Sequence, residues 1–184
     1  MIPTRDEAMT IFLRYNEGDS LLRHALCVEA AMRHYAEING EDIEKWGVVG
    51  LLHDLDYEKF PEEHCQKTAT ILRENGVDEE IIRAIMSHAY GMRTDVEPIS
   101  IMEKTLYTVD ELTGLIMATA LMRPNRLEGL EVKSVMKKFK SPNFAAGVDR
   151  DVIQDGCNRW GVDLADVISE VVAGMQKRVD IIFG

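Results

Sequence analysis

The sequence predicts an all-α protein that folds as one domain. Apolar residues recur at helical spacing along most of the chain, and no alternating apolar and polar runs flank a hairpin turn. A length of 184 residues is enough for one full hydrophobic core, and no repeat or long linker divides the chain. We therefore expect a single compact multi-helix bundle over residues 1–184.

The predicted helices have several recognisable ends. Pro61 suits the first turn of a helix, Gly76 a C-terminal cap, and Asp78 the N-cap of the helix that follows. Ser100 and Glu103 form a capping-box pattern. In chain order, helices are expected at 4–16, 20–38, 42–54, 61–75, 79–89, 100–121, 131–139, 149–160 and 163–182, with loops or lids at 90–98 and 140–148.

One helix is expected to end in a polar pair. The apolar run 46–52 leads directly into His53-Asp54. A buried carboxylate is tolerated only when it is paired, hydrogen-bonded or bound to a metal. Adjacent side chains of a helix diverge by about 100°, so both residues reach one ion only if the helix ends there. The acidic residues and the proline just beyond the pair are typical of such an end.

Other histidines are predicted to face the core. Projection of 20–38 as a helix places His24 on the apolar stripe and His34 toward solvent. His88 continues the apolar spacing of the helix at 79–89, which turns this histidine inward as well.

The remaining candidates follow from the same projection. His64 shares a helix face with Thr68. Asp110 lies at the edge of the buried face of 100–121, whereas Glu111 points nearly the opposite way. A shared metal site would satisfy all the inward polar groups together. One or two divalent ions of iron, manganese, zinc, nickel or cobalt suit imidazole and carboxylate ligands. The candidate ligands are His24, His53, Asp54, His64, His88 and Asp110.

In the order of these histidines and aspartates, the sequence resembles the HD-domain metal-dependent phosphohydrolase superfamily. The signature of that superfamily is a histidine, a later His-Asp pair and an aspartate farther on. His24, His53-Asp54 and Asp110 match it in order. Members that bind two metals add two histidines before the last aspartate, as His64 and His88 do here.

The resemblance implies an HD-domain-like core over about 20–117 and a C-terminal helical extension over 118–184. It also implies that His24, His53, Asp54 and Asp110 hold one ion, that His64 and His88 hold a second, and that Asp54 bridges the two. The expected activity is hydrolysis of a phosphoester or phosphoanhydride in a small, nucleotide-like substrate by metal-activated water.

Two groups of residues are candidates for catalysis and for substrate binding. Asp54 would orient the attacking water, and Asp56 follows closely enough to supply a general acid or base. The segment 123–150 carries seven basic and three acidic residues, a net charge of +4 in a chain of −11. Lys137, Lys138 and Arg150 of this segment are the candidates for binding a phosphate.

Two other readings stay open at this point. The same ligands could serve a di-iron oxygenase of the HD type, or a non-catalytic module that a metal stabilises. The acidic net charge disfavours a nucleic-acid polymer as partner. The polar N-terminus and the absence of a long apolar stretch argue against a signal peptide and a membrane span, and the three scattered cysteines favour reduced thiols in the cytoplasm.

Overall fold

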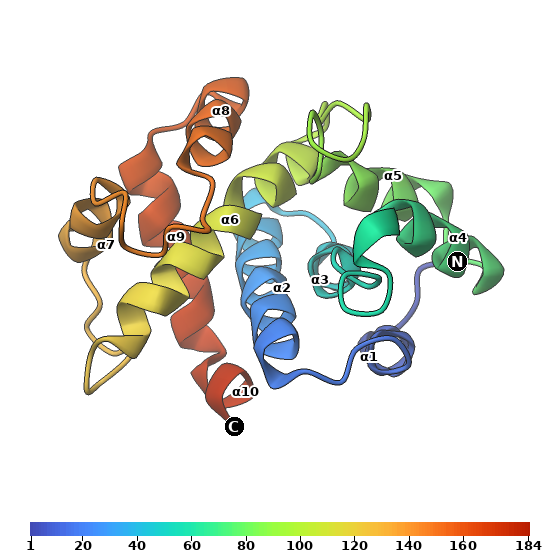
Figure 1. Ribbon diagram of the computed structural model, residues 1–184, viewed down its shortest axis with the longest axis horizontal. Coiled ribbons are helices and arrows are strands. Elements are labelled where there is room, and N and C mark those ends of the chain that lie inside the picture. Colours follow the sequence, from blue (N-terminus) through green and yellow to red (C-terminus); the bar gives the residue numbers. More distant parts are fainter.

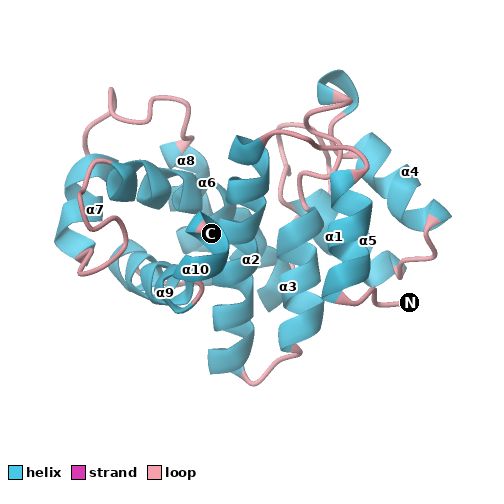
Figure 2. Ribbon diagram, turned by 90° about the horizontal axis from the view of Figure 1, so that it is seen from below, coloured by secondary structure: helices cyan, strands magenta, loops and turns pink.

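The computed structural model describes residues 1–184 and confirms the all-α prediction. It contains ten α-helices and one 3₁₀ helix, and its only β-type pairing is an isolated bridge between Tyr90 and Thr94 (Figure 2). The elements are α1 (Arg5–Leu13), α2 (Asp19–Asn39), α3 (Ile43–Leu52), η1 (Pro61–Glu63), α4 (Gln66–Glu74), α5 (Glu79–Ser87), α6 (Ile101–Leu121), α7 (Val132–Phe139), α8 (Arg150–Trp160), α9 (Leu164–Lys177) and α10 (Val179–Phe183).

The long helix α2 lies at the centre of the molecule (Figure 1). It packs against α3 on one side and α9 on the other, while α6 crosses between the two groups of helices. Its middle turns are buried all round, as the position of the helix requires. One continuous hydrophobic core joins α1–α6 to the helices that follow α6.

A glycine allows α3 to approach α2 closely. A Cβ atom at Gly50 would lie 2.9 Å from the carbonyl oxygen of Val28 and 3.0 Å from the Cα of Glu29. Any side chain here would therefore push the helices apart. This crossing matters for the site because α3 ends at Leu52, immediately before His53, which is its C-cap. The expected helix end at the polar pair is confirmed.

The capping predictions also hold. Ser100 Oγ accepts the N–H of Glu103, and the Glu103 carboxylate accepts the N–H of Ser100. Asp78 occupies the N-cap of α5, although its carboxylate pairs with the amino group of Met1 and not with the helix.

The prediction of a single helix over 61–75 is wrong. The chain forms η1, turns at Cys65 with φ +74°, and only then enters α4. The reason is a remote cap: the N–H of Thr68, a free donor of the first turn of α4, is bound 2.8 Å away by the buried carboxylate of Asp56. The predicted helix 163–182 is likewise interrupted at Arg178.

The prediction that His34 is solvated is also wrong. α9 covers that side of α2, so His34 is buried. Its Nε2 lies 2.6 Å from the Glu170 carboxylate and its Nδ1 lies 3.2 Å from Lys177 Nζ. No helix of the fold combines the length and the apolar character that a bilayer crossing demands.

Candidate metal centre

Four of the predicted ligands bring their donor atoms together where α2, α3 and α6 meet. His24 comes from α2, His53 and Asp54 from the end of α3, and Asp110 from α6. His24 Nε2 lies 3.1 Å from His53 Nε2 and 2.9 Å from Asp110 Oδ1. Asp54 Oδ2 lies 3.3 Å from His53 Nε2 and 3.6 Å from His24 Nε2. We call these four residues the first donor set.

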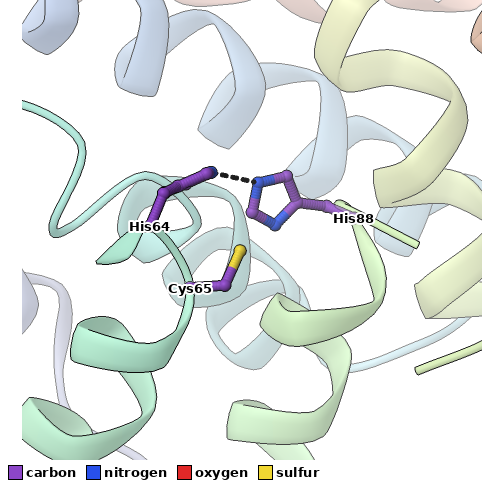
Figure 3. Close-up of side chains that lie close together, drawn as sticks. All are labelled: His64, Cys65 and His88. Carbon is purple, nitrogen blue, oxygen red and sulfur yellow. Dashed lines mark hydrogen bonds between the residues drawn. The ribbon is translucent and has the colours of Figure 1, made fainter. Parts of the chain in front are cut away.

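The two remaining predicted ligands form a second donor set with Asp54. His64 Nε2 and His88 Nε2 are 3.3 Å apart and face each other (Figure 3). Each nitrogen is 3.4 Å from Asp54 Oδ1. Asp54 therefore contributes one carboxylate oxygen to each donor set.

These separations fit the ligands of a transition-metal ion. An ion about 2.1 Å from each ligand keeps neighbouring donors roughly 3.0 Å apart in an octahedron and roughly 3.4 Å apart in a tetrahedron. The measured separations within both donor sets run from 2.9 to 3.6 Å. Both sets therefore have the spacing that a bound divalent ion requires.

Hydrogen bonds fix the protons of three imidazoles on the side away from the donor sets. The Nδ1 atoms of His53 and His88 lie 2.8 Å from Gly50 O and 2.5 Å from Ile85 O, so we assign an N–H to each. His64 Nδ1 donates to Asp56 Oδ1 at 2.7 Å. In the neutral form of each ring, Nε2 then carries an unprotonated lone pair, as a metal ligand must.

This assignment leaves lone pairs opposed to one another. In the second donor set, the Nε2 atoms of His64 and His88 face each other at 3.3 Å with both Nδ1 protons already used. Two opposed lone pairs beside a carboxylate oxygen make a favourable place for a cation. The chemistry of the donors therefore fits the metal that the sequence implies.

Electrostatics in the first donor set point the same way. Burial alone would lower the pKa of His53, but Asp54 and Asp110 hold it well above its ordinary value. Burial would raise the pKa of both carboxyls, and yet the neighbouring histidines hold them well below their usual range. Both aspartates therefore remain ionised, and the set carries negative charge to offer a cation.

Asp56 does not act where the sequence analysis expected it. Its carboxylate is fully buried, accepts hydrogen bonds from His64 and Thr68, and does not line the cavity. A group in that position orients the His64 ring and cannot reach a substrate. The expectation of a general acid or base at Asp56 is therefore corrected to a positioning role.

Cys65 is a residue that sequence reasoning missed near the second donor set. Its sulfur lies within 4.8 Å of one ring nitrogen of His64 and one of His88 (Figure 3). The side chain is buried, and burial together with Asp56 raises the pKa of its thiol. Adjacency to His64 was the only available signal, because the positive φ that turns the chain at Cys65 has no sequence signature.

The donor sets open into a cavity of about 680 Å³. Glu111 lines this cavity next to Asp110, so the prediction that it points away from the site is wrong. The segment before α8 covers that side of α6, and the Asp149 N–H binds the Glu111 carboxylate at 2.9 Å. Burial and the neighbouring Asp110 raise the pKa of Glu111.

The three basic residues predicted to bind phosphate do not line the cavity. Lys137 is exposed elsewhere, and Lys138 Nζ lies 4.4 Å from the centre of the Phe144 ring. The Arg150 guanidinium is used internally: it donates to backbone carbonyl oxygens of Lys138, Phe139, Ser141, Phe144, Ala145 and Val148. We call this arrangement the Arg150 clasp.

Comparison with known proteins agrees with the geometry. The family model described as HD domain matches residues 21–115, more than half of the 184-residue chain. The chain therefore belongs to the HD-domain family, whose members are mostly metal-dependent phosphohydrolases. All residues of both donor sets lie within the matched segment. Neither a curated protein nor a solved structure gives a significant match.

Proposed function

We propose that this protein is a metal-dependent phosphohydrolase that cleaves a phosphoester or phosphoanhydride bond in a small, nucleotide-like substrate. The observation that carries the proposal is the position of Asp54, whose two oxygens belong to two different donor sets. A shared carboxylate is the arrangement that two cooperating ions need. Membership of the HD-domain family supports the same reaction class.

In this proposal each donor set holds one divalent ion. His24, His53 and Asp110 serve the first ion, His64 and His88 the second, and Asp54 both. When bound, such ions supply water of lowered pKa for attack at phosphorus and neutralise charge on the phosphoryl oxygens. The backbone carbonyls at Gly50 and Ile85 and the Asp56 carboxylate hold the three imidazoles in the ligating tautomer.

The cavity walls support a small substrate with an apolar or planar part. A volume of about 680 Å³ lies in the ordinary range for small-molecule sites. Tyr57 and Met92 line it and are half exposed, so they offer apolar surface to an organic group. Glu58 and Glu111 add negative charge to the wall, which disfavours a nucleic-acid polymer.

The proposal is tested by metal content and phosphate release. Protein purified without chelator should contain up to two equivalents of a transition metal by elemental analysis. A panel of phosphomonoesters and phosphoanhydrides, assayed with manganese, cobalt, nickel or zinc, should identify a substrate. Asp54→Asn should then lower kcat/KM on the order of a thousandfold.

His34→Gln is the matched control, because His34 lies on α2 with His24 but outside both donor sets. It should keep the metal content and the activity of the wild type. If the protein contains metal but releases phosphate from no compound of the panel, the proposal is wrong and the protein is a metal-stabilised binding module. Oxygen consumption together with a mixed-valent di-iron signal would replace it with an oxygenase.

A further inference from the structure

The cavity wall has an uneven distribution of charge. Besides the donor histidines and the Tyr57 phenol, its ionisable groups are the carboxylates of Asp54, Glu58, Asp110 and Glu111 and a single guanidinium, that of Arg93. No lysine lines the cavity. Arg93 is therefore the only lysine or arginine side chain in this wall.

The backbone holds Arg93 in a fixed position relative to the second donor set. The chain turns back directly after His88: the N–H groups of Arg93 and Thr94 both donate to Ala89 O, at 2.9 and 3.2 Å. Gln66 of α4 donates to the carbonyl oxygen of Arg93 at 3.1 Å. Arg93 thus lies in a short turn that these hydrogen bonds fix, five residues after His88 of the second donor set.

The side chain of Arg93 has no partner within the protein. The structure contains no ion pair, side-chain hydrogen bond or aromatic contact of its guanidinium, and the residue is exposed. Nearly every other arginine is engaged, as Arg83 is with Glu103, Arg159 with Asp155, and Arg150 with the carbonyls of its clasp. The only other arginine without such a contact is Arg14, which lies on a different face and lines a different cavity.

We infer that Arg93 selects substrates with a second anionic group, next to the phosphoryl group that the metals hold. This inference rests on the proposed function. In the proposed function the phosphoryl group under attack is bound by the ions of the two donor sets, whereas Arg93 is an exposed residue of the cavity wall that belongs to neither set. A guanidinium binds a phosphate or carboxylate through two parallel hydrogen bonds. The substrate class is therefore a phosphoanhydride or a phosphoester with a neighbouring acidic group.

The test compares two non-hydrolysable probes on manganese-loaded protein by titration calorimetry. Methylphosphonate has one anionic group, and methylenediphosphonate has two. Metal content is measured before and after each titration, because diphosphonates chelate metal. Arg93→Gln should weaken methylenediphosphonate binding roughly 10- to 100-fold and leave methylphosphonate binding unchanged. Arg14→Gln, the matched control, should change neither affinity.

Each other outcome is decisive. An equal loss for both probes would mean that Arg93 holds the phosphoryl group itself, and no loss for either would mean that it binds no part of the ligand; both results overturn the inference and leave the proposed function standing. If neither probe binds metal-loaded wild-type protein, the phosphohydrolase proposal fails and the inference fails with it.

Discussion

Asp54 and Asp56 are two residues apart, and their carboxylates face different surroundings. Asp54 meets four imidazoles, two at each oxygen. Asp56 meets an imidazole N–H and a backbone N–H and has no exposed surface. Both residues follow the apolar run of α3 in the sequence. The later path of the chain, through η1 and the turn at Cys65, brings His64 and Thr68 to Asp56. This path makes Asp56 a positioning residue, whereas Asp54 is shared by the two donor sets.

Asp56→Asn should weaken the second donor set selectively. An amide is a poorer acceptor for the His64 N–H, and a ligand whose outer partner is lost binds metal roughly 10- to 100-fold more weakly. Equilibrium dialysis should show one ion bound as before and one bound weakly. Glu62→Gln, a change at an exposed carboxylate of η1, is the control. Two ions bound with wild-type affinity in Asp56→Asn would contradict the positioning role.

His53 should make metal affinity depend on pH. Burial alone would lower its pKa, but Asp54 and Asp110 raise it well above 6.5. As the pH falls through this raised pKa, a proton competes with the metal for Nε2 and the affinity decreases. In metal-free protein the sign is opposite: charged His53 contributes stability that is fully present below 6.5 and is lost as the pH rises through the folded-state pKa. Calorimetric melting of chelator-treated protein should therefore show Tm falling with rising pH, and a Tm that rises instead would contradict the assignment.

At the scale of elements, the crossing of α2 and α3 sets the distance between His24 and His53. The two helices touch at Gly50, three residues before His53. The same turn of α3 also supplies the carbonyl oxygen that fixes the His53 tautomer. A change in this crossing therefore acts on the first donor set directly.

Gly50→Ala should separate α2 from α3 and weaken metal binding. The new methyl group would meet the backbone of Val28 and Glu29, and relief of such overpacking costs about 1–3 kcal/mol. Thermal unfolding and dialysis of the metal-loaded protein measure the two effects. Gly114→Ala is the control, because its Cβ would meet only a Val148 methyl at 3.7 Å and alanine favours a helix interior. Unchanged metal affinity in Gly50→Ala would show that the crossing does not position the ligands.

The sequence predicts helices and candidate ligands correctly where the local apolar periodicity determines which way a side chain points. His24 and Asp110 lie on long helices, so their inward orientation follows from the apolar stripes beside them. His34 and Glu111 lie on the same helices, but the helices and loops after α6 decide their surroundings. Those contacts join residues far apart in the chain, and no local pattern predicts them. The break at Cys65 depends in the same way on the remote carboxylate of Asp56.

At the scale of the whole molecule, the segment after α6 completes both the core and the cavity. Tyr35 of α2 packs on Trp160 of α8 with ring centres 4.9 Å apart, and His34 bonds to Glu170 of α9. The buried carboxylate of Glu29 lies 3.8 Å from Arg178. Val148 lines the cavity that holds the donor sets. Without the helices after α6, the segment that matches the HD-domain family therefore leaves one side of α2 uncovered.

Truncation after Leu121 should abolish cooperative folding. The shortened chain would expose the faces of α2 and α6 that α8 and α9 cover. Circular dichroism melting should show no cooperative transition, and co-expression of residues 122–184 as a separate chain should restore one. A truncated protein that melts cooperatively and binds metal would show instead that 1–121 is an independent unit.

The Arg150 clasp has a consequence for how this protein can change during evolution. Arg150 grips the segment 138–148 only through backbone carbonyl oxygens, and every amino acid provides one. The hydrogen bonds that Arg150 makes to this segment therefore do not depend on which side chains it carries, although Phe139, Phe144, Ala145 and Val148 also pack against the core. Val148 lines the cavity at the end of this segment, whereas the residues of both donor sets lie elsewhere in the chain. Substitutions at position 148 could therefore change which substrates the proposed phosphohydrolase accepts, while the residues of both donor sets are inherited unaltered.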